Sequence, residues 1–499
     1  MTTSTEVGKP SAAYNAALPS WGMVEALKGG TSAMRAARET YLPRHEAEKE
    51  DAYNARLARS FLFTAYARTI ELLVGKAFSK PVTPGDEVPE PLKVLFKDID
   101  LAGTDLHAFA AQLFEAGLDE GLSFVLVDLP NTTPATTLAE ERQAGVRPYW
   151  SLIRASSVIG WRVVVENGKP ILDQLRVRED AVLPDGEFGE KAVQRVRVYY
   201  RDGRWELWQA DTPQTGQMAR TYQIIEDGRL TIGRIPLVAF YAKKVGHMQG
   251  RPRLEDLAWL NVEHWQKSSD QNHILHVARV PILFGKGFEG AITVSPNSLV
   301  TAQGEHADLK YVEHTGAAIG AGQTDLDSLV DRMAALGVDM LIKRKATSGT
   351  ADATATGKAI TESGENSVLG NLARQLKLTL DAALALTAEW QQQDPEQVGE
   401  IDMDTQIGVP AAEKTDLEVL LKARMAGEIS AETFFAEMQR REVLDPSIDF
   451  EEERDRIEQE GPALGLPGMS GNADGTAPED DPDAPKESAA AAGARGALP

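Results

Sequence analysis

The spacing of hydrophobic residues predicts helices in the first part of the chain and strands in the part that follows. Apolar residues recur every three or four positions at residues 46–60, 64–78 and 104–120, which is the period of an amphipathic helix. Between about residues 148 and 244 the period changes to two, and turn pairs such as Asn167-Gly168 separate the runs. This pattern indicates an α+β fold with an antiparallel meander. The expected strands are residues 123–129, 149–154, 158–165, 171–178, 193–201, 204–209 and 237–242.

Long helical patterns return in the second half of the chain. Residues 252–278 and 324–344 are predicted to form two long helices, and short extended stretches between residues 280 and 312 separate them. Residues 267–273 (KSSDQNH) are polar on every face, which is typical of a helix that bridges domains or packs against a neighbouring subunit. A third helical stretch is expected at residues 358–392.

The two ends of the chain are expected to be less regular. Residues 1–20 are predicted to form a flexible arm, and residues 401–407 a strand that rejoins the earlier sheet. Three short helices are expected within residues 410–460, because capping residues mark their ends. Residues 461–499 are mostly Gly, Pro and Ala with an acidic cluster, which predicts disorder. The capping residues are Gly427, Ser430 and Asp449.

A run of small side chains interrupts the helical patterns at residues 346–357 (ATSGTADATATG). It has no large apolar side chain to bury, so it is expected to remain mobile. Long structureless loops inside a domain are uncommon and usually functional. With basic residues at its roots, the loop could touch a moving polyanion weakly; the alternative is a surface insertion. The candidate residues are Lys343, Arg344, Lys345, Thr350, Asp352 and Lys358.

The net charge of −23 is concentrated near the end of the chain. From Asp381 onward there are 28 acidic and 9 basic residues, a net of −19, which leaves −4 for the first 380 residues. Such acidity argues against sequence-specific DNA binding, which needs basic surface, but does not exclude a protein that lets DNA pass without sticking. No run of apolar residues is long enough for a membrane span, and no signal peptide opens the chain, so cytoplasmic synthesis is expected.

The motifs for nucleotide binding are incomplete. Residues 285–290 (GKGFEG) match G-x-G-x-x-G, but an extended stretch follows them instead of the helix that would hold a pyrophosphate. Residues 352–359 resemble a phosphate loop faintly, since Asp352 and Ala359 replace the first glycine and the magnesium-binding hydroxyl. No enzymatic activity is therefore expected, and a nucleotide-dependent oxidoreductase that uses residues 285–290 is the enzyme alternative.

Metal and thiol chemistry are not expected either. The chain contains no cysteine, which excludes disulfides, thiolate catalysis and cysteine-ligated zinc. His264, His273 and His276 lie on one predicted helix without the spacing of a zinc site, and are interpreted as packing or exposed residues. No metal and no cofactor is therefore expected.

Several short motifs follow one another in an order that resembles a known family. They are YLP at 41–43, YNAR at 53–56, FSKP at 78–81, SFVLVDLP at 123–130, RPYW at 147–150, GW at 160–161, the long segment 254–287, AGEISAETFF at 426–435 and FEEERDRIEQE at 450–460. In this order they resemble the portal proteins of tailed bacteriophages, in particular those with the domain of unknown function DUF4055. The resemblance extends over residues 20–460.

The resemblance implies a ring-forming portal fold with an α/β wing, long stem helices, a small β-rich clip and an α-helical crown. The implied segments are the wing at 21–250, the first stem helix at 251–279, the clip at 280–323, the second stem helix at 324–344, the tunnel loop at 345–358, the wing's long helix and return strand at 359–409 and the crown at 410–460.

The same resemblance implies a function and partners. A portal is a homo-oligomer, usually a dodecamer, at one capsid vertex of the virion, assembled in the bacterial cytoplasm. It conducts double-stranded DNA non-specifically during packaging and ejection, whereas a separate terminase supplies the ATPase motor. The implied partners are the terminase large subunit, the head–tail adaptor and the major capsid protein or scaffold, and no membrane. Another virion structural protein, such as a capsid or baseplate component, is the alternative.

Overall fold

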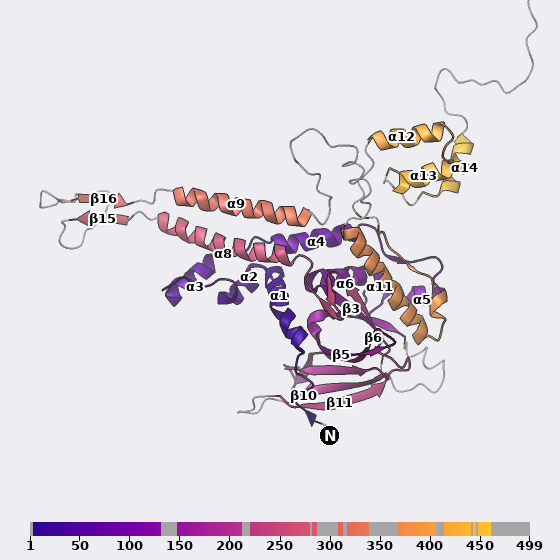
Figure 1. The fold of residues 1–499 in the computed structure, drawn as a ribbon, viewed down its shortest axis with the longest axis horizontal. Coiled ribbons are helices and arrows are strands. Elements are labelled where there is room, and N and C mark those ends of the chain that lie inside the picture. Colours follow the sequence, from indigo (N-terminus) through magenta and orange to yellow (C-terminus); the bar gives the residue numbers. More distant parts are fainter. Residues whose placement is uncertain are drawn as a thin grey trace, which may run out of the picture. The chain divides into compact units, whose positions relative to one another are not determined.

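The computed structural model divides the chain into two compact units, Met1–Val409 and Pro410–Pro499 (Figure 1). The first unit contains both helices and sheets, which confirms the mixed class expected from the sequence. Within the described residues, no helix combines the length and apolar character that a membrane crossing requires. The structure describes residues 3–130, 147–211, 220–279, 282–286, 308–312, 317–338, 368–405, 407, 414–440, 443–445 and 448–460.

The largest sheet has six antiparallel strands in the order β1-β11-β10-β9-β6-β5. The turn between β5 and β6 lies at Asn167-Gly168, and both residues have the positive φ that this turn requires. Most of the predicted meander is therefore confirmed. The strands are β1 (Thr3–Ser4), β5 (Val158–Glu166), β6 (Lys169–Arg178), β9 (Arg195–Tyr200), β10 (Arg204–Ala210) and β11 (Tyr222–Arg229).

Two strands predicted for the meander belong instead to a second sheet. This sheet has the order β12-β3-β4, with β3 (Leu122–Asp128) between β4 (Tyr149–Arg154) and β12 (Leu237–Tyr241). Val125 and Val127 of β3 join one hydrophobic core, and the alternate residues of the same strand join the other. The small sheet thus separates the two cores, because β3 is apolar on both faces.

Four short strand pairs complete the described sheets of the first unit, and three of them lie outside the segment of the long helices. The predicted return strand is shorter than expected and does not rejoin the earlier sheet, because β17 (Ile401–Asp402) pairs with β2 (Thr83–Pro84). The Ile401 amide donates to the Asp381 carboxylate at 2.7 Å, which holds this strand beside helix α11. The pattern did not predict the hairpin of β7 (Ala181–Asp185) and β8 (Gly189–Val193), whose residues are mostly polar. The third pair is β13 (Lys244–Gly246) and β14 (Gln249–Gly250).

The N-terminal segment is ordered, contrary to the predicted flexible arm. Helix α1 (Ala12–Lys28) begins after Ser11, whose side chain accepts a hydrogen bond from the Tyr14 amide. Tyr14 and Trp21 lie on one face of the helix and are buried. The pattern is hard to recognise because alanines separate these aromatic residues, so the apolar face rests on few large side chains.

The other helices of the first unit pack around the larger core. The helices predicted at residues 46–60, 64–78 and 104–120 are confirmed, each shorter at one end or both. Trp150 of β4 lies in this core and donates from Nε1 to the Thr387 hydroxyl at 2.7 Å, which connects the small sheet to α11. The helices are α2 (Gly30–Ala36), α3 (Glu50–Arg59), α4 (Ala65–Ala77), α5 (Glu90–Lys93), α6 (Leu106–Glu120), α8 (Glu255–Ala278), α9 (Ala317–Val338) and α11 (Val368–Trp390).

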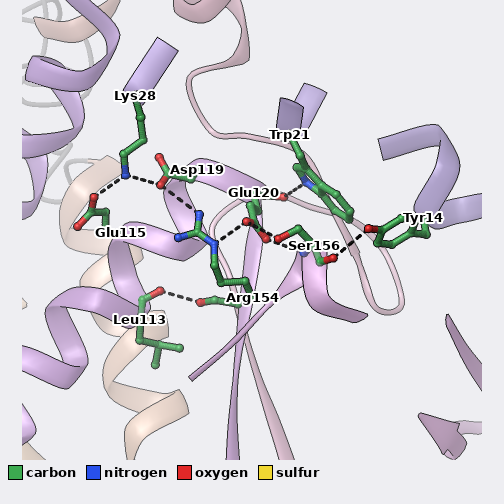
Figure 2. A network of polar contacts seen from close by, with 10 residues as sticks. Tyr14, Trp21, Lys28, Leu113, Glu115, Asp119, Glu120, Arg154 and Ser156 are labelled. Carbon is green, nitrogen blue, oxygen red and sulfur yellow. Dashed lines mark hydrogen bonds and ion pairs between the residues drawn. The ribbon is translucent and has the colours of Figure 1, made fainter. Parts of the chain in front are cut away.

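A buried ionic network fixes α1 against α6 and β4 (Figure 2). Asp119 of α6 is fully buried and lies 2.5 Å from the Lys28 ammonium and 3.5 Å from the Arg154 guanidinium. Arg154 also donates to Glu120 at 2.7 Å, and the Trp21 indole donates to the Glu120 carbonyl at 3.0 Å. Burial raises the pKa of Asp119 although both cations attract the charged form.

The second unit contains three short helices, as predicted from their capping residues. Gly427 has the positive φ of a C-terminal cap, the Ser430 hydroxyl accepts from the Thr433 amide at 3.0 Å, and Asp449 accepts from the first amides of the last helix. Among the described residues of this unit, none has a buried side chain. The predicted disordered tail, residues 461–499, lies outside the described residues. The helices are α12 (Lys414–Met425), α13 (Ala431–Arg440) and α14 (Phe450–Glu460).

Candidate functional site

The predicted DNA-contacting residues fall between two described helices. Helix α9 ends at Val338 and α11 begins at Val368. The predicted tunnel loop at 345–358 and its roots lie outside the described residues, so their role stays a prediction. These residues are Lys343, Arg344, Lys345, Thr350, Asp352 and Lys358.

The two long helices predicted before this loop are confirmed and run side by side, antiparallel (Figure 1). The Lys267 ammonium of α8 lies 2.8 Å from the Asp325 carboxylate of α9, and Gln271 donates to the Ile319 carbonyl at 2.8 Å. A Cβ on Gly322 would lie 2.2 Å from the Gln271 amide oxygen, so this glycine permits the close approach of the helices.

Helix α9 begins earlier than the sequence pattern suggested. It includes residues 317–323 (AAIGAGQ), so the predicted helix start at residue 324 is too late. These residues are small or uncharged and show no polar face, so they carry little periodicity. The large buried side chains of α9 are Leu326, Leu329 and Met333, and Met333 belongs to the larger hydrophobic core.

A strand hairpin stands between the two helices in the chain. Strand β15 (Ile282–Lys286) pairs antiparallel with β16 (Asp308–Val312), and Ile282 is opposite Val312. The first two residues of the G-x-G-x-x-G match, Gly285 and Lys286, lie within β15. The remaining residues of the match, 287–290, lie outside the described residues.

The polar middle of α8 contacts other parts of its own chain, and packing against a neighbouring subunit stays a prediction. The Ser269 and Ser60 hydroxyls lie 2.8 Å apart, and Gln266 donates to the Tyr41 carbonyl at 3.1 Å. One turn earlier, Asn261 bonds both to the Phe63 carbonyl and to a backbone amide of α4. These side chains satisfy backbone groups that the loops around α3 leave without partners.

Arg56 is the centre of the contact between α3 and α8. Its guanidinium is 2% exposed and donates to both oxygens of Glu48, at 2.9 and 2.8 Å. It also donates to the Pro43 carbonyl at 2.7 Å and lies 3.7 Å from Asp270 of α8. The buried ring of Tyr53 lies against the same guanidinium, 5.5 Å from its centre. Arg56 therefore holds α8, at Ser269 and Asp270, on the N-terminal helices.

The Arg56 pair makes the stability of the first unit depend on pH. Hydrogen bonds from Arg56 lower the pKa of Glu48 to about 2, against an opposing effect of burial. A carboxyl with a lowered pKa stabilises the fold above its unfolded pKa, and this stabilisation is lost as the pH falls through the folded pKa. We therefore expect the free energy of unfolding to fall between pH 4.5 and about pH 2.

Urea denaturation of the wild type and of Glu48→Gln across this pH range measures the effect. The variant is expected to be less stable at pH 7, by on the order of 3 kcal/mol, and the difference between the two proteins should shrink towards pH 2. The buried Asp119 titrates in both proteins, so its contribution cancels in the difference. A difference that is independent of pH would contradict this role of Glu48.

The two long helices, α8 and α9, carry a net negative charge. Together α8 and α9 contain seven acidic and two basic residues, a net of −5. The outer face of α9 exposes Asp327 and Asp331, whereas its buried face is apolar. Such a surface repels phosphates at short range and gives them no continuous basic track to bind.

The three histidines of α8 do not form a metal site in the described structure. His264 is half-buried, and its ring centre lies 5.3 Å from that of Phe63. Burial lowers the pKa of His264. Among the described residues, no group of three or more acidic or histidine side chains is arranged to hold a metal ion.

Comparison with known proteins matches this part of the chain to a family. Residues 253–391, from α8 through α11, match the family model described as Domain of unknown function (DUF4055), which confirms that part of the resemblance. No curated protein matches the sequence.

Two solved structures are similar to the chain. A chain of the virion of a native gene transfer agent particle is 14% identical, with a TM-score of 0.39, over 76% of this chain and 89% of that chain. A chain from the neck of an empty gene transfer agent particle is 13% identical, with a TM-score of 0.37, over 79% of this chain and 95% of that chain. Both are weak similarities of fold.

Proposed function

We propose that the chain is the subunit of a phage-type portal, a homo-oligomeric ring through which double-stranded DNA enters and leaves a capsid. The observation that carries the proposal is the pair of long antiparallel helices, α8 and α9, which flank a strand hairpin and are anchored by Arg56 on an α/β body. The resemblance to portals implies a wing followed by two stem helices that flank a clip. The family match at residues 253–391 includes the two helices and the hairpin but not the wing at 21–250.

The charge distribution supports a conduit rather than a DNA-binding protein. The stem helices carry a net charge of −5, so passing phosphates are repelled and do not stick. Basic residues at the roots of the tunnel loop, Lys343, Lys345 and Lys358, supply weak, salt-sensitive contacts. On this proposal the ring is a dodecamer in the virion, and terminase, a head–tail adaptor and the capsid dock on it.

The loop is tested by reversing its charges. A variant with Lys343, Lys345 and Lys358 replaced by glutamate should assemble like the wild type but package or retain less DNA, because repulsion replaces the weak contacts. DNA per particle, measured after nuclease treatment, gives the readout. A control with three exposed lysines of the body replaced in the same way should package normally. Normal packaging by the loop variant would show that the loop is only a surface insertion. The control lysines are Lys49, Lys97 and Lys169.

A further inference from the structure

The hairpin of β7 and β8 has no packing partner that buries it. Its strands pair only with each other, from Ala181 opposite Val193 to Asp185 opposite Gly189, and none of its side chains is buried. Phe188 at its tip is 91% exposed, and Val182 is 63% exposed. An isolated two-stranded hairpin is marginally stable in water and gains stability by packing against another surface. This hairpin therefore presents a phenylalanine that is suited to bury itself elsewhere.

The same chain contains a cavity of suitable size beside α1, lined by both apolar and polar residues. The cavity, hereafter the α1 cavity, has a volume of about 250 Å³. An engineered apolar cavity of about 150 Å³ binds benzene, so the side chain of a phenylalanine fits. Alanines from α1 form one wall and aromatic rings another. Its apolar lining includes Ala13, Ala16, Ala17, Trp21, Phe124 and Trp161.

Hydrogen bonds around α1 keep this cavity from closing. The Tyr14 hydroxyl donates to the Ser156 carbonyl at 3.0 Å, and the Trp21 indole donates to the Glu120 carbonyl at 3.0 Å (Figure 2). On the remaining side, Ser20 donates to Glu255 of α8 at 2.6 Å. Because α1 is fixed at three points, it does not move inward to fill the space that its alanines leave.

The hairpin tip is acidic, whereas two basic residues accompany the acidic Glu255 at the α1 cavity. Asp185, Glu187 and Glu190 surround Phe188 at the hairpin tip. Arg251 lines the α1 cavity, and Lys244 lies beside it on β13, opposite Gly250. Complementary charges at the edge of a contact guide the encounter and fix its orientation.

We propose that the Phe188 hairpin of one copy of this chain docks in the α1 cavity of a second copy. The proposal rests on the proposed function, because it requires copies to assemble. Hairpin and cavity are different surfaces of the chain, so the contact is heterologous: each copy uses its hairpin on one neighbour and its cavity on the other. Heterologous contacts that close generate rings, and a large aromatic anchor in a fitted pocket is the usual centre of such an interface.

Cysteine pairing between copies tests the contact, and the chain has no cysteine of its own. Glu187→Cys and Gln249→Cys are purified separately, reduced, and mixed under mild oxidation. A covalent dimer that appears in the mixture, and in neither variant alone, is expected, because a disulfide needs Cα atoms within about 7 Å. Lys169→Cys, in the turn of another hairpin, replaces Glu187→Cys as the control and should give no dimer with Gln249→Cys.

Assembly measured by analytical ultracentrifugation gives an independent test. Phe188→Ala should weaken association about thirtyfold or more, as loss of an interface anchor does, and Ala16→Trp should do the same by filling the cavity. Phe61→Ala, which removes another exposed aromatic side chain, is the control and should assemble normally. Glu187→Lys and Arg251→Glu should each weaken association, and the double variant should recover it.

The outcomes separate this contact from the proposed function. If the wild type assembles and Phe188→Ala assembles equally well with no cross-link between mixed copies, the contact is wrong and the ring stands. If the wild type does not assemble at all, the proposed function fails and the contact fails with it. A cross-link within a single chain containing both cysteines, without any between copies, would also overturn the contact.

Discussion

Replacing Arg56 by methionine should lower the free energy of unfolding of the first unit by about 3–5 kcal/mol. The variant keeps much of the side-chain volume but leaves the Glu48 carboxylate, which is 7% exposed, without its bidentate partner. It also removes the hydrogen bond to the Pro43 carbonyl. Urea denaturation followed by circular dichroism measures the loss.

The same helix offers a matched control for this prediction. Arg59 is exposed on α3, and Arg59→Met should change stability by no more than about 0.5 kcal/mol. The double variant Glu48→Gln/Arg56→Met should recover part of the loss, because it removes the unpaired charge. If Arg56→Met and Arg59→Met are equally stable, Arg56 does not anchor the long helices.

Gly121→Ala should be the most damaging of the glycine substitutions, because it combines strain with a backbone clash. Gly121 ends α6 with φ of +86°, and an added Cβ would lie 2.2 Å from the backbone of Arg251. Arg251 is on the segment that leads into α8, and the Gly121 carbonyl accepts two amides from the strand end at 242–243. The backbone of Arg251 cannot rotate away as a side chain could. The start of α8 would therefore have to shift.

Substitution of Gly168 separates the cost of backbone strain from the cost of the steric clash. Gly168 has nearly the same conformation, φ of +77°, but nothing lies within 4 Å of its added Cβ. Gly168→Ala should cost only the strain of the left-handed conformation, about 1–2 kcal/mol. Gly121→Ala should cost about 1–3 kcal/mol more, as overpacking does. Denaturation midpoints of the two variants give the comparison, and equal losses would show that the Arg251 backbone yields without cost.

Short stretches of sequence were sufficient to predict the elements whose ends or register are set by residues within one turn. Gly427, Ser430 and Asp449 correctly marked the ends of short helices, because a capping residue acts on amides and carbonyls within its own turn. The alternation in β5 and β6 likewise predicted paired strands, since their turn at Asn167-Gly168 fixes the register.

Features that depend on distant partners could not be predicted in this way. The polar middle of α8 indicated a helix that bridges domains or packs against a neighbour, but the pattern could not identify Ser60, far away in the sequence, as the partner of Ser269. The division of the meander between two sheets depends on β3, whose two faces enter different cores. The pattern predicted a strand there but could not show what covers each face. At the tunnel loop, the assignment of Lys343, Lys345 and Lys358 to DNA contact remains a proposal.

Negative-stain electron microscopy of the purified full-length protein tests the central proposal most directly. If the chain is a portal subunit, particles are rings with a central opening and rotational symmetry, with twelve copies as the expected number. The Arg59→Met variant should form the same rings, which provides a control for substitutions that leave the fold intact. A protein that remains monomeric at micromolar concentration, or that forms sheets or shells without a central opening, would contradict the portal assignment.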